Sequence, residues 1–88
     1  MNFGKALEVL KQGRKVTRKG WNGKGMFVFI DPGYTCAGYE SFTGQKNNII
    51  NPCFFIKNTN KTLSTWVPSV NDCLAEDWYE AVDNNVEE

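Results

Sequence analysis

The chain has 88 residues, and its ten basic and ten acidic side chains give a formal net charge of zero. This length supports one small domain, residues 1–88, and the balanced charge argues against duplex DNA, which demands many phosphate contacts. No signal peptide and no apolar run of membrane length are visible, and we expect no DNA, RNA or membrane partner. Three cysteines without a CxxC motif indicate reduced thiols in a cytosolic protein.

Histidine is absent from the sequence. This removes the commonest general base and the commonest zinc ligand, and we expect neither a metal nor a cofactor. Charges are unevenly placed: residues 1–30 carry seven Lys or Arg and one acid, whereas residues 70–88 carry seven acids and no base. The basic part could meet an anionic ligand, or the two parts could neutralise each other on one surface.

Residues 3–12 are predicted to form a helix of about three turns. Asn2 fits the N-cap position, and Gly13 fits the position just after a helix end. Apolar side chains recur at helical spacing along one stripe: Phe3, Ala6, Leu7 and Leu10. Because a helix of this length is marginal alone, we expect its stripe to pack on one face of a sheet.

Two predicted strands follow, with a glycine-rich stretch between them. Residues 15–18 form a short strand with Val16 inward and Thr17 outward. Residues 26–31 are the most apolar segment, hydrophobic on both faces, which is typical of a strand covered on both sides. We expect one face to meet the helix and the other a second subunit, and Pro32-Gly33 to close the strand with a turn.

Residues 33–52 are the least regular part of the sequence, rich in Gly, Asn, Ser and Thr. A loop of this length in a small domain is usually functional or disordered. Three aromatic residues, Tyr34, Tyr39 and Phe42, argue against plain disorder. We therefore predict a variable loop that forms either a packed flap or an arm reaching another subunit.

The C-terminal part is predicted to contain a hairpin, a capped helical turn and a last strand. Turn-forming residues at 58–61 separate the hairpin strands, Pro68 ends the second strand, and Ser69 caps the helical turn. The four elements span residues 53–57, 62–67, 70–74 and 78–82. With the first helix they give an α+β fold, an N-terminal helix packed on a small antiparallel sheet, followed by an acidic tail at residues 83–88.

Residues 18–25 hold three glycines, three cations, a Trp and an Asn. Arg and Lys bind phosphate, and an indole offers a face on which a base stacks. One interpretation is therefore a tight loop that delivers Trp21, Asn22 and Lys24 to the mouth of the sheet. The other, which composition favours, is a glycine-rich turn with a half-buried Trp.

A second polar stretch, residues 66–78, contains a bend after its proline. Ser69, Asn71 and Asp72 on this bend suit recognition of hydroxyl and carbonyl groups. Alternatively, they form a Ser-capped turn in which Asp72 stabilises the first-turn amides. The two tryptophans of this stretch are expected in the core.

Catalysis is not expected from these residues. Neither Ser69 nor Cys73 has an evident base partner. Glu76 and Asp77 are adjacent and would point apart in an extended chain, whereas two carboxylates that hydrolyse a glycosidic bond must flank it. No phosphate-binding fingerprint such as a Walker loop is present.

Both ends of the chain resemble a known family. The matching pieces are Asn2-Phe3-Gly4, Ala6-Leu7, Gly13, Val16-Thr17-Arg18, Gly20 to Met26, Trp66, Pro68-Ser69, Asp72 and Leu74 to Trp78. They are similar to the second type of the phage Thoeris anti-defense sponge family, formerly a domain of unknown function. Residues 33–52 match little of the family pattern and are longer than is usual in it, and Val70 stands where a polar residue is expected.

This resemblance implies a homotetramer in the cytoplasm of the infected host. It implies binding and sequestration, without cleavage, of glycocyclic ADP-ribose signals made by TIR enzymes and, in some members, of CBASS cyclic dinucleotides at a separate site. By motif position, the ligand-binding residues would be Arg18, Trp21, Asn22, Gly23, Lys24, Ser69 and Asp72. Trp21 would stack on a base, its polar neighbours in the loop would hold phosphates or ribose, and Ser69 and Asp72 would meet ribose or base edges. The alternatives are an enzyme that degrades such a nucleotide, an inhibitor that binds a host protein, and a simple structural module.

Overall fold

The computed structural model describes residues 1–82. Its elements in that range are α1 (Phe3–Lys11), β1 (Val16–Arg18), β2 (Phe27–Asp31), β3 (Tyr34–Cys36), α2 (Glu40–Thr43), β4 (Asn48–Ile50), β5 (Cys53–Lys57), β6 (Leu63–Thr65), α3 (Val70–Leu74) and β7 (Trp78–Glu80). The predicted acidic tail, residues 83–88, lies outside the described residues. Within residues 1–82, no helix has the length and hydrophobicity needed to span a membrane.

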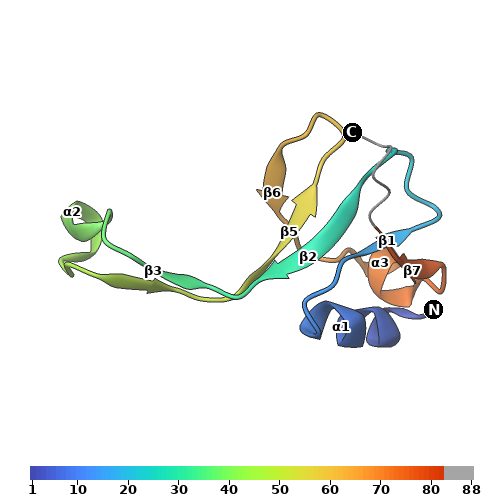
Figure 1. Ribbon diagram of the computed structural model, residues 1–88, viewed down its shortest axis with the longest axis horizontal. Coiled ribbons are helices and arrows are strands. Elements are labelled where there is room, and N and C mark those ends of the chain that lie inside the picture. Colours follow the sequence, from blue (N-terminus) through green and yellow to red (C-terminus); the bar gives the residue numbers. More distant parts are fainter. Residues whose placement is uncertain (83–88) are drawn as a thin grey trace.

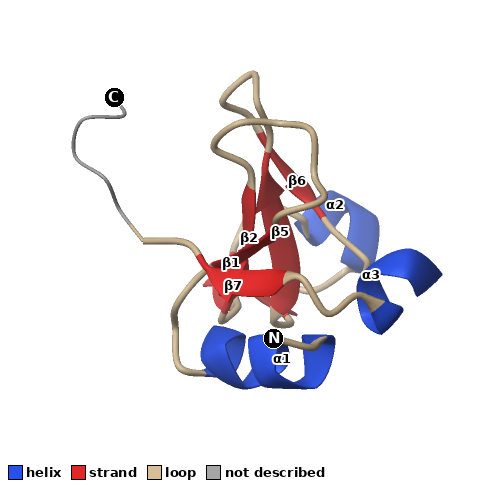
Figure 2. Ribbon diagram, turned by 90° about the vertical axis from the view of Figure 1, so that its right-hand side faces the viewer, coloured by secondary structure: helices blue, strands red, loops and turns tan. Residues whose placement is uncertain are grey.

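Five strands form one antiparallel sheet in the order β6-β5-β2-β1-β7, and β3 pairs with β4 in a separate two-stranded ladder. Helix α1 lies along one side of the five-stranded sheet, with α3 beside it near β7 (Figure 1, Figure 2). The predicted α+β fold, an N-terminal helix packed on a small antiparallel sheet, is confirmed. We call the side of the sheet away from α1 the outer face; it carries Phe27, Phe29 and Phe55.

Helix α1 forms where its local signals predict. The Asn2 side chain accepts a hydrogen bond from the Lys5 amide at 2.9 Å, which caps the first turn. Gly13 follows the helix with φ of +85°, a left-handed conformation that favours glycine. Ala6 and Leu10 on the apolar stripe are buried in the core, so the predicted helix is confirmed together with its cap and its stop.

The core lies between α1 and the sheet. Val16 and Val28 pair across neighbouring strands, and both are fully buried with Trp78. Thr17 points to the opposite side from Val16, as strand alternation requires. Its predicted outward direction is confirmed, yet only 7% of the residue is accessible. The larger side chain of Tyr79 lies directly beside it on β7 and helps to cover it.

Residues 33–52 form a projecting arm. Strands β3 and β4 pair along it, and the short helix α2 lies at its tip (Figure 1). Two residues separate β2 from β3 and two separate β4 from β5, so the arm continues the β2–β5 hairpin in the same register. The prediction of an irregular segment is therefore wrong, whereas the packed flap stays a prediction. The shape of the predicted arm is confirmed, and its contact with another subunit stays a prediction.

A bend at the root of the arm explains this difference. Gly33 has φ of +90°, and its amide donates a hydrogen bond to the Asp31 side chain at 2.8 Å. A Cβ at Gly33 would collide with the main chain of Ile50 on the opposite strand. The Pro32-Gly33 pair therefore bends a long hairpin and does not reverse the chain, contrary to the turn predicted there.

The C-terminal elements follow the predicted order. Strands β5 and β6 form a hairpin, and the Asn58 amide donates a hydrogen bond to the Thr62 carbonyl at 2.8 Å to close its turn. Ser69 caps α3, and β7 pairs with β1. Strands β6 and β7 are shorter than predicted, at three residues each.

Candidate functional site

Arg18 at the end of β1 joins the two polar stretches of the sequence. Its Nε donates a hydrogen bond to Asp77 Oδ1, and its Nη1 donates one to Asp72 Oδ1, each at 2.8 Å. Asp72 lies in α3 and Asp77 directly precedes β7, so one guanidinium links the start of the glycine-rich loop to the α3 segment. We call this cluster the Arg18 corner: Arg18, Gly20, Trp21, Ser69, Asp72 and Asp77.

Asp77 also fixes the backbone of the loop. Its Oδ2 accepts a hydrogen bond from the Gly20 amide at 2.8 Å, and its carbonyl accepts one from the Lys19 amide at 3.2 Å. A Cβ at Gly20 would lie 2.9 Å from that carboxylate oxygen. The glycine therefore permits the close approach that holds the loop in place.

Asp72 caps α3 and also contacts the loop. The Ser69 hydroxyl accepts a hydrogen bond from the Asp72 amide, and Asp72 Oδ2 accepts one from the Ser69 amide, both at 3.0 Å. Asp72 Oδ1 also accepts one from Trp21 Nε1 at 3.3 Å, and only 7% of the residue is accessible. The capping interpretation is confirmed, and the same carboxylate ties the loop indole to the helical turn.

The contacts at the corner stabilise its three charges. Burial alone raises the pKa of Asp72, but hydrogen bonds from Ser69, Arg18 and Trp21 outweigh it and hold that pKa below its ordinary value of 3.8. The hydrogen bond from Arg18, with another from the Gly20 amide, lowers the pKa of Asp77. Asp77 and Asp72 in turn raise the pKa of Arg18. At neutral pH the corner is therefore an ionised guanidinium between two ionised carboxylates.

Trp21 packs among the other indoles. Its ring lies edge-on to Trp78 at a centroid distance of 5.3 Å and to Trp66 at 6.2 Å. The residue is half-buried, which agrees with the interpretation as a glycine-rich turn. Trp78 lies in the core as expected, and Trp66 packs against it. Stacking of a base on the accessible part of Trp21 stays a prediction.

The rest of the glycine-rich loop reaches the β5–β6 turn. Asn22 and Lys24 are exposed there. Gly23 packs beside Met26 and Thr59, and a Cβ at this position would collide with both side chains. The corner thus brings together four of the seven predicted residues, namely Arg18, Trp21, Ser69 and Asp72. It does not include the other three, which are Asn22, Gly23 and Lys24.

Two residues of the corner are missing from the set predicted by sequence. In that reasoning Asp77 is a candidate catalytic carboxylate beside Glu76, Gly20 is one of three glycines, and both lie within pieces that match the family, but neither is assigned to the binding site. Their hydrogen bond joins positions 57 apart in the sequence, and no local pattern signals such a pair. The available signal is the opposite charge of the two ends of the chain, and the ion pairs of Arg18 support the interpretation that these ends neutralise each other.

Two surface hollows of the described residues lie outside the corner. One, of about 330 Å³, is lined by Gly13, Arg14, Lys15, Glu80 and Ala81. The other, of about 220 Å³ at the root of the arm, is lined by Ile30, Pro52, Cys53 and Phe54. Neither hollow contains a predicted ligand-binding residue. Among residues 1–82, no group of three or more His, Cys, Asp or Glu side chains is placed to hold a metal ion.

Comparison with known families decides where the chain belongs. The model of the Thoeris anti-defense 2-like domain matches residues 1–81. The chain belongs to the Thoeris anti-defense 2-like family. Thoeris anti-defense 2 of Bacillus phage SP01 is 49% identical over 82 residues, which cover 89% of this chain and 91% of the phage protein. The resemblance carried by the sequence motifs is confirmed, and the family supports a phage anti-defense role.

In this Thoeris anti-defense 2-like chain, the motifs that carry the resemblance also meet in space. Gly20 and Trp21 come from one matching piece and Asp77 from another, and all three lie at the Arg18 corner. The two proteins are covered to nearly the same extent, which makes them similar in length. The expectation that residues 33–52 are longer than is usual in the family stays a prediction.

Proposed function

We propose that this chain binds and sequesters cyclic nucleotide immune signals without cleaving them, in the cytoplasm of the infected host. The ligand class is the glycocyclic ADP-ribose made by TIR enzymes of Thoeris systems. Membership of the Thoeris anti-defense 2-like family supports this proposal. The observation that carries it is the Arg18 corner, where Trp21 and the start of a cationic glycine-rich loop are fixed beside the capped α3 turn.

In this proposal, each predicted residue makes a different contact with the ligand. The Nε and Nη1 groups of Arg18 already bind carboxylates, and within residues 1–82 its Nη2 donates no hydrogen bond, so Nη2 is the group free to meet a phosphate. Lys24 and Asn22 are exposed and bring further donors. In this proposal the exposed Ser69 hydroxyl and the small accessible edge of Asp72 would meet ribose or base edges, and Trp21 would supply an aromatic surface.

Tight sequestration requires more binding free energy than one open surface can provide. A Kd of about 1 nM corresponds to roughly 12 kcal/mol, whereas one stacked base contributes about 1–3 kcal/mol. The hollows described for a single copy contain none of the predicted binding residues. We therefore place the complete pocket between two copies in a homotetramer, where a second surface closes over the corner.

The carboxylates of the corner favour binding over cleavage. Asp72 and Asp77 both pair with Arg18, and their lowered pKa values keep them ionised at neutral pH. An ionised carboxylate that accepts hydrogen bonds from its neighbours has no proton to give as a general acid. Cys73 is exposed on α3 and forms no hydrogen bond with a base in the described part of the chain. These features support a sponge over the competing proposal of a nucleotide-degrading enzyme.

A capture-and-release assay tests the proposal. The protein is mixed with a nucleotide extract from cells with activated TIR enzyme, freed of unbound ligand and heated, and the released molecules are identified by mass spectrometry. We expect intact cyclic nucleotide at close to one per site. Broken nucleotide would instead establish an enzyme, and an empty protein that forms a stable complex with a host protein would establish a protein-binding inhibitor.

A pair of lysine variants assigns the site in the same assay. Lys24→Ala removes an exposed cation of the glycine-rich loop, and Lys11→Ala removes an exposed cation at the end of α1. Because both side chains are exposed, neither change should disturb the fold. We expect Lys24→Ala to weaken capture about tenfold and Lys11→Ala to leave it unchanged, and equal effects would remove the loop from the site.

A second site for CBASS cyclic dinucleotides forms part of the proposal, supported only by the family resemblance. Isothermal titration with one ligand in the presence of saturating amounts of the other tests it. Unchanged affinity for the second ligand would mean separate sites, and mutual exclusion would mean one shared site. No binding of a cyclic dinucleotide would remove this part of the proposal and leave the first part standing.

A further inference from the structure

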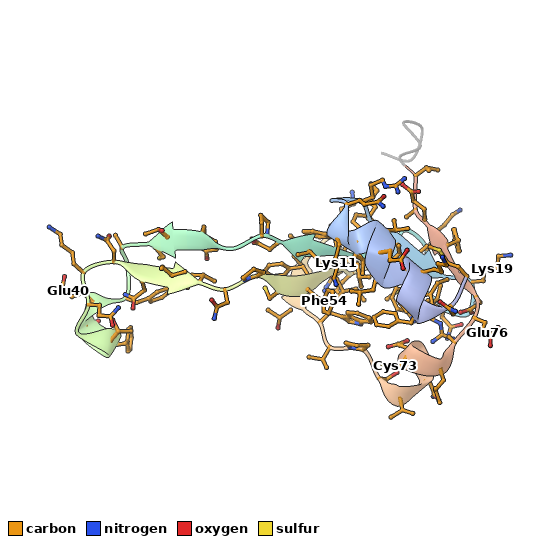
Figure 3. The ribbon with its side chains drawn as sticks, turned by 90° about the horizontal axis from the view of Figure 1, so that it is seen from below. Lys11, Lys19, Glu40, Phe54, Cys73 and Glu76 are labelled. Carbon is orange, nitrogen blue, oxygen red and sulfur yellow. The ribbon has the colours of Figure 1, made fainter. Side chains whose placement is uncertain are left out.

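The arm, residues 33–52, stands clear of the body of the molecule. Its strands β3 and β4 make extensive contacts only with each other among the described elements. Glu40 at the tip lies at one end of the molecule, far from Lys19 and Glu76 at the other (Figure 3). Beyond the bend, the arm is a two-stranded extension of the β2–β5 hairpin with no third strand or helix of the described residues beside it. Because such a ribbon is marginally stable in water, a surface that packs along it would stabilise it.

The surface of the arm has the composition of a protein interface. Four large apolar side chains are strongly exposed along it: Tyr34 (53%), Tyr39 (44%), Phe42 (85%) and Ile49 (79%). Glu40 and Lys46 are its two charged residues out of 20, whereas charged residues make up 23% of the whole chain. Interface cores are enriched in aromatic residues and depleted in charge, so this surface favours a protein partner.

The outer face of the sheet is a second apolar surface, although its three phenylalanines are half-buried and the ammonium groups of Lys15 and Lys57 lie over the Phe27 ring at 4.6 and 5.6 Å. Phe29 lies between Phe27 and Phe55, at ring-centroid distances of 6.1 and 5.9 Å. Leu63 and Tyr79 on the flanking strands are 52% and 44% exposed on the same side. Helix α1 covers the opposite side, and no helix of residues 1–82 packs on this one (Figure 2).

We infer that two copies of this chain exchange arms, so that the arm of each copy packs on the outer face of the other. The inference rests on the oligomer in the proposed function and names the surfaces that build it. An arm cannot fold back onto its own outer face, because it continues β2 and β5 outward from the sheet. A second copy offers the same aromatic surface without this restriction, and reciprocal exchange gives a closed twofold contact.

The dimensions of the two surfaces agree with this arrangement. About six residues of extended chain carry the arm roughly 20 Å outward, and the five residues of β2 span about 17 Å. At about 200 Å² for each large side chain, the four exposed residues of one arm present on the order of 500 Å² of apolar surface. This surface is divided between the two sides of the ribbon, because Tyr34 pairs with Ile50 and Ile49 pairs with Thr35. If one side of each arm packs on the partner, two arms and the two faces that they cover would bury on the order of 1,000 Å², which reaches the lower end of specific interfaces.

Arm variants test the inference by molecular mass. Phe42→Asp combined with Ile49→Asp places charges on the two most exposed apolar residues of the arm, where the fold of the body is not disturbed. Ser41→Asp is the matched control, since it adds a charge to an exposed residue of the same helix. By light scattering we expect the full chain and the control to form the oligomer and the double variant to fall at least twofold in mass. A monomeric full chain, or a double variant of unchanged mass, would overturn the inference.

Crosslinking identifies the surface that receives the arm. A photoreactive phenylalanine analogue at Phe42 is introduced into unlabelled protein, which is mixed with isotope-labelled protein before irradiation. We expect crosslinks from the unlabelled arm to labelled peptides that contain Phe29 or Phe55. Crosslinks confined to the arms, or none between copies, would count against the exchange.

The nucleotide assay keeps this inference separate from the proposed function. If the full chain captures nucleotide as a monomer, ligand binding survives and arm exchange is wrong. If the full chain is an oligomer that depends on its arm but captures no nucleotide, arm exchange survives and the sponge is wrong. The two conclusions can therefore fail independently.

Discussion

At the scale of the residue, Arg18 is the side chain that ties the two segments of the candidate site together. It is 18% exposed and carries ion pairs to Asp72 and Asp77, both at 2.8 Å. A guanidinium suits this position, because its planar donors reach two carboxylates at once, whereas a lysine ammonium acts as a point charge. Arg18 thus mainly fixes the conformation of the loop. Its Nη2 group remains available to bind a ligand.

Removal of Asp72 should destabilise the fold as well as weaken binding. Asp72→Ala leaves the Ser69 amide and Trp21 Nε1 without their acceptor and takes away half of the ion pairing of Arg18. We expect a loss of about 2–4 kcal/mol in the free energy of unfolding, measured by chemical denaturation. Asn71→Ala, an exposed change in the same helix, should cost less than about 0.5 kcal/mol. Equal stability of the two variants would show that the corner is not structural.

The two lowered carboxyl pKa values also predict an acid dependence of stability. The folded state holds Asp72 and Asp77 ionised at pH values where the unfolded chain, with ordinary pKa values near 3.8, already binds protons. Their contribution is therefore fully present above about pH 4 and is lost as the pH falls through the folded-state pKa values. We expect the Tm to fall less steeply below pH 4 in the double variant Asp72→Asn, Asp77→Asn than in the unchanged chain, with Glu76→Gln as control. Parallel curves of Tm against pH would contradict the lowered pKa values of Asp72 and Asp77.

At the scale of the element, the bend at Gly33 decides whether residues 33–52 form an arm. Asp31 and Gly33 close the bend locally, and the glycine comes close to the main chain at Ile50. A reversal at this point would have ended the hairpin and left residues 34–50 as a loop. The bend instead lets the same two strands pair again beyond it.

Gly33→Ala should therefore disrupt the arm more than the body. An alanine there combines an unfavourable φ of +90° with a collision against the main chain, and the chain must shift to admit it. Gly44→Ala is the matched control, since its φ is +77° but nothing lies within 4 Å of the added carbon. By hydrogen exchange we expect faster exchange of the β3–β4 amides in Gly33→Ala, with β2–β5 protection retained. Similar exchange in both variants would show that the close approach is unimportant.

The elements also show which features a sequence can predict. Helix α1 and the α3 turn depend on contacts three or four residues apart, so Asn2, Gly13, Ser69 and Asp72 signal them locally. Position 33 gives the same turn signal whether the strands stop or continue, because pairing between β3 and β4 is decided by residues 12 to 16 positions away. The Arg18–Asp77 contact spans 59 positions and has no local signal, so the sequence identified the two motifs of the site but not what joins them.

At the scale of the whole molecule, the chain combines a small body with an exposed arm. Its principal extents are 44 × 30 × 21 Å, and only five hydrophobic residues are fully buried among those described. A domain of this size gains stability readily from association. The exposed aromatic residues of the arm and the half-buried phenylalanines of the outer face indicate where that stability would come from.

Thermal stability should therefore depend on protein concentration. An oligomer that binds only folded copies raises the Tm as the concentration rises. We expect an increase of several degrees in the unchanged chain over a hundredfold range, measured by scanning calorimetry. The Phe42→Asp, Ile49→Asp variant should show little change over the same range. A concentration-independent Tm in both would mean that folding and association are not coupled.

Because the β2–β5 and β3–β4 ladders share one register, this hairpin can change in length only in certain steps. Side chains alternate between faces with a period of two. Deletion of one residue from each strand would turn the tip over and move Ile49 to the other side of the ribbon. Deletion of two from each would keep its orientation and shorten the reach by about 7 Å. Among relatives, arm length should thus vary in blocks of four residues, which would make the hairpin a molecular ruler for the spacing of assembled copies.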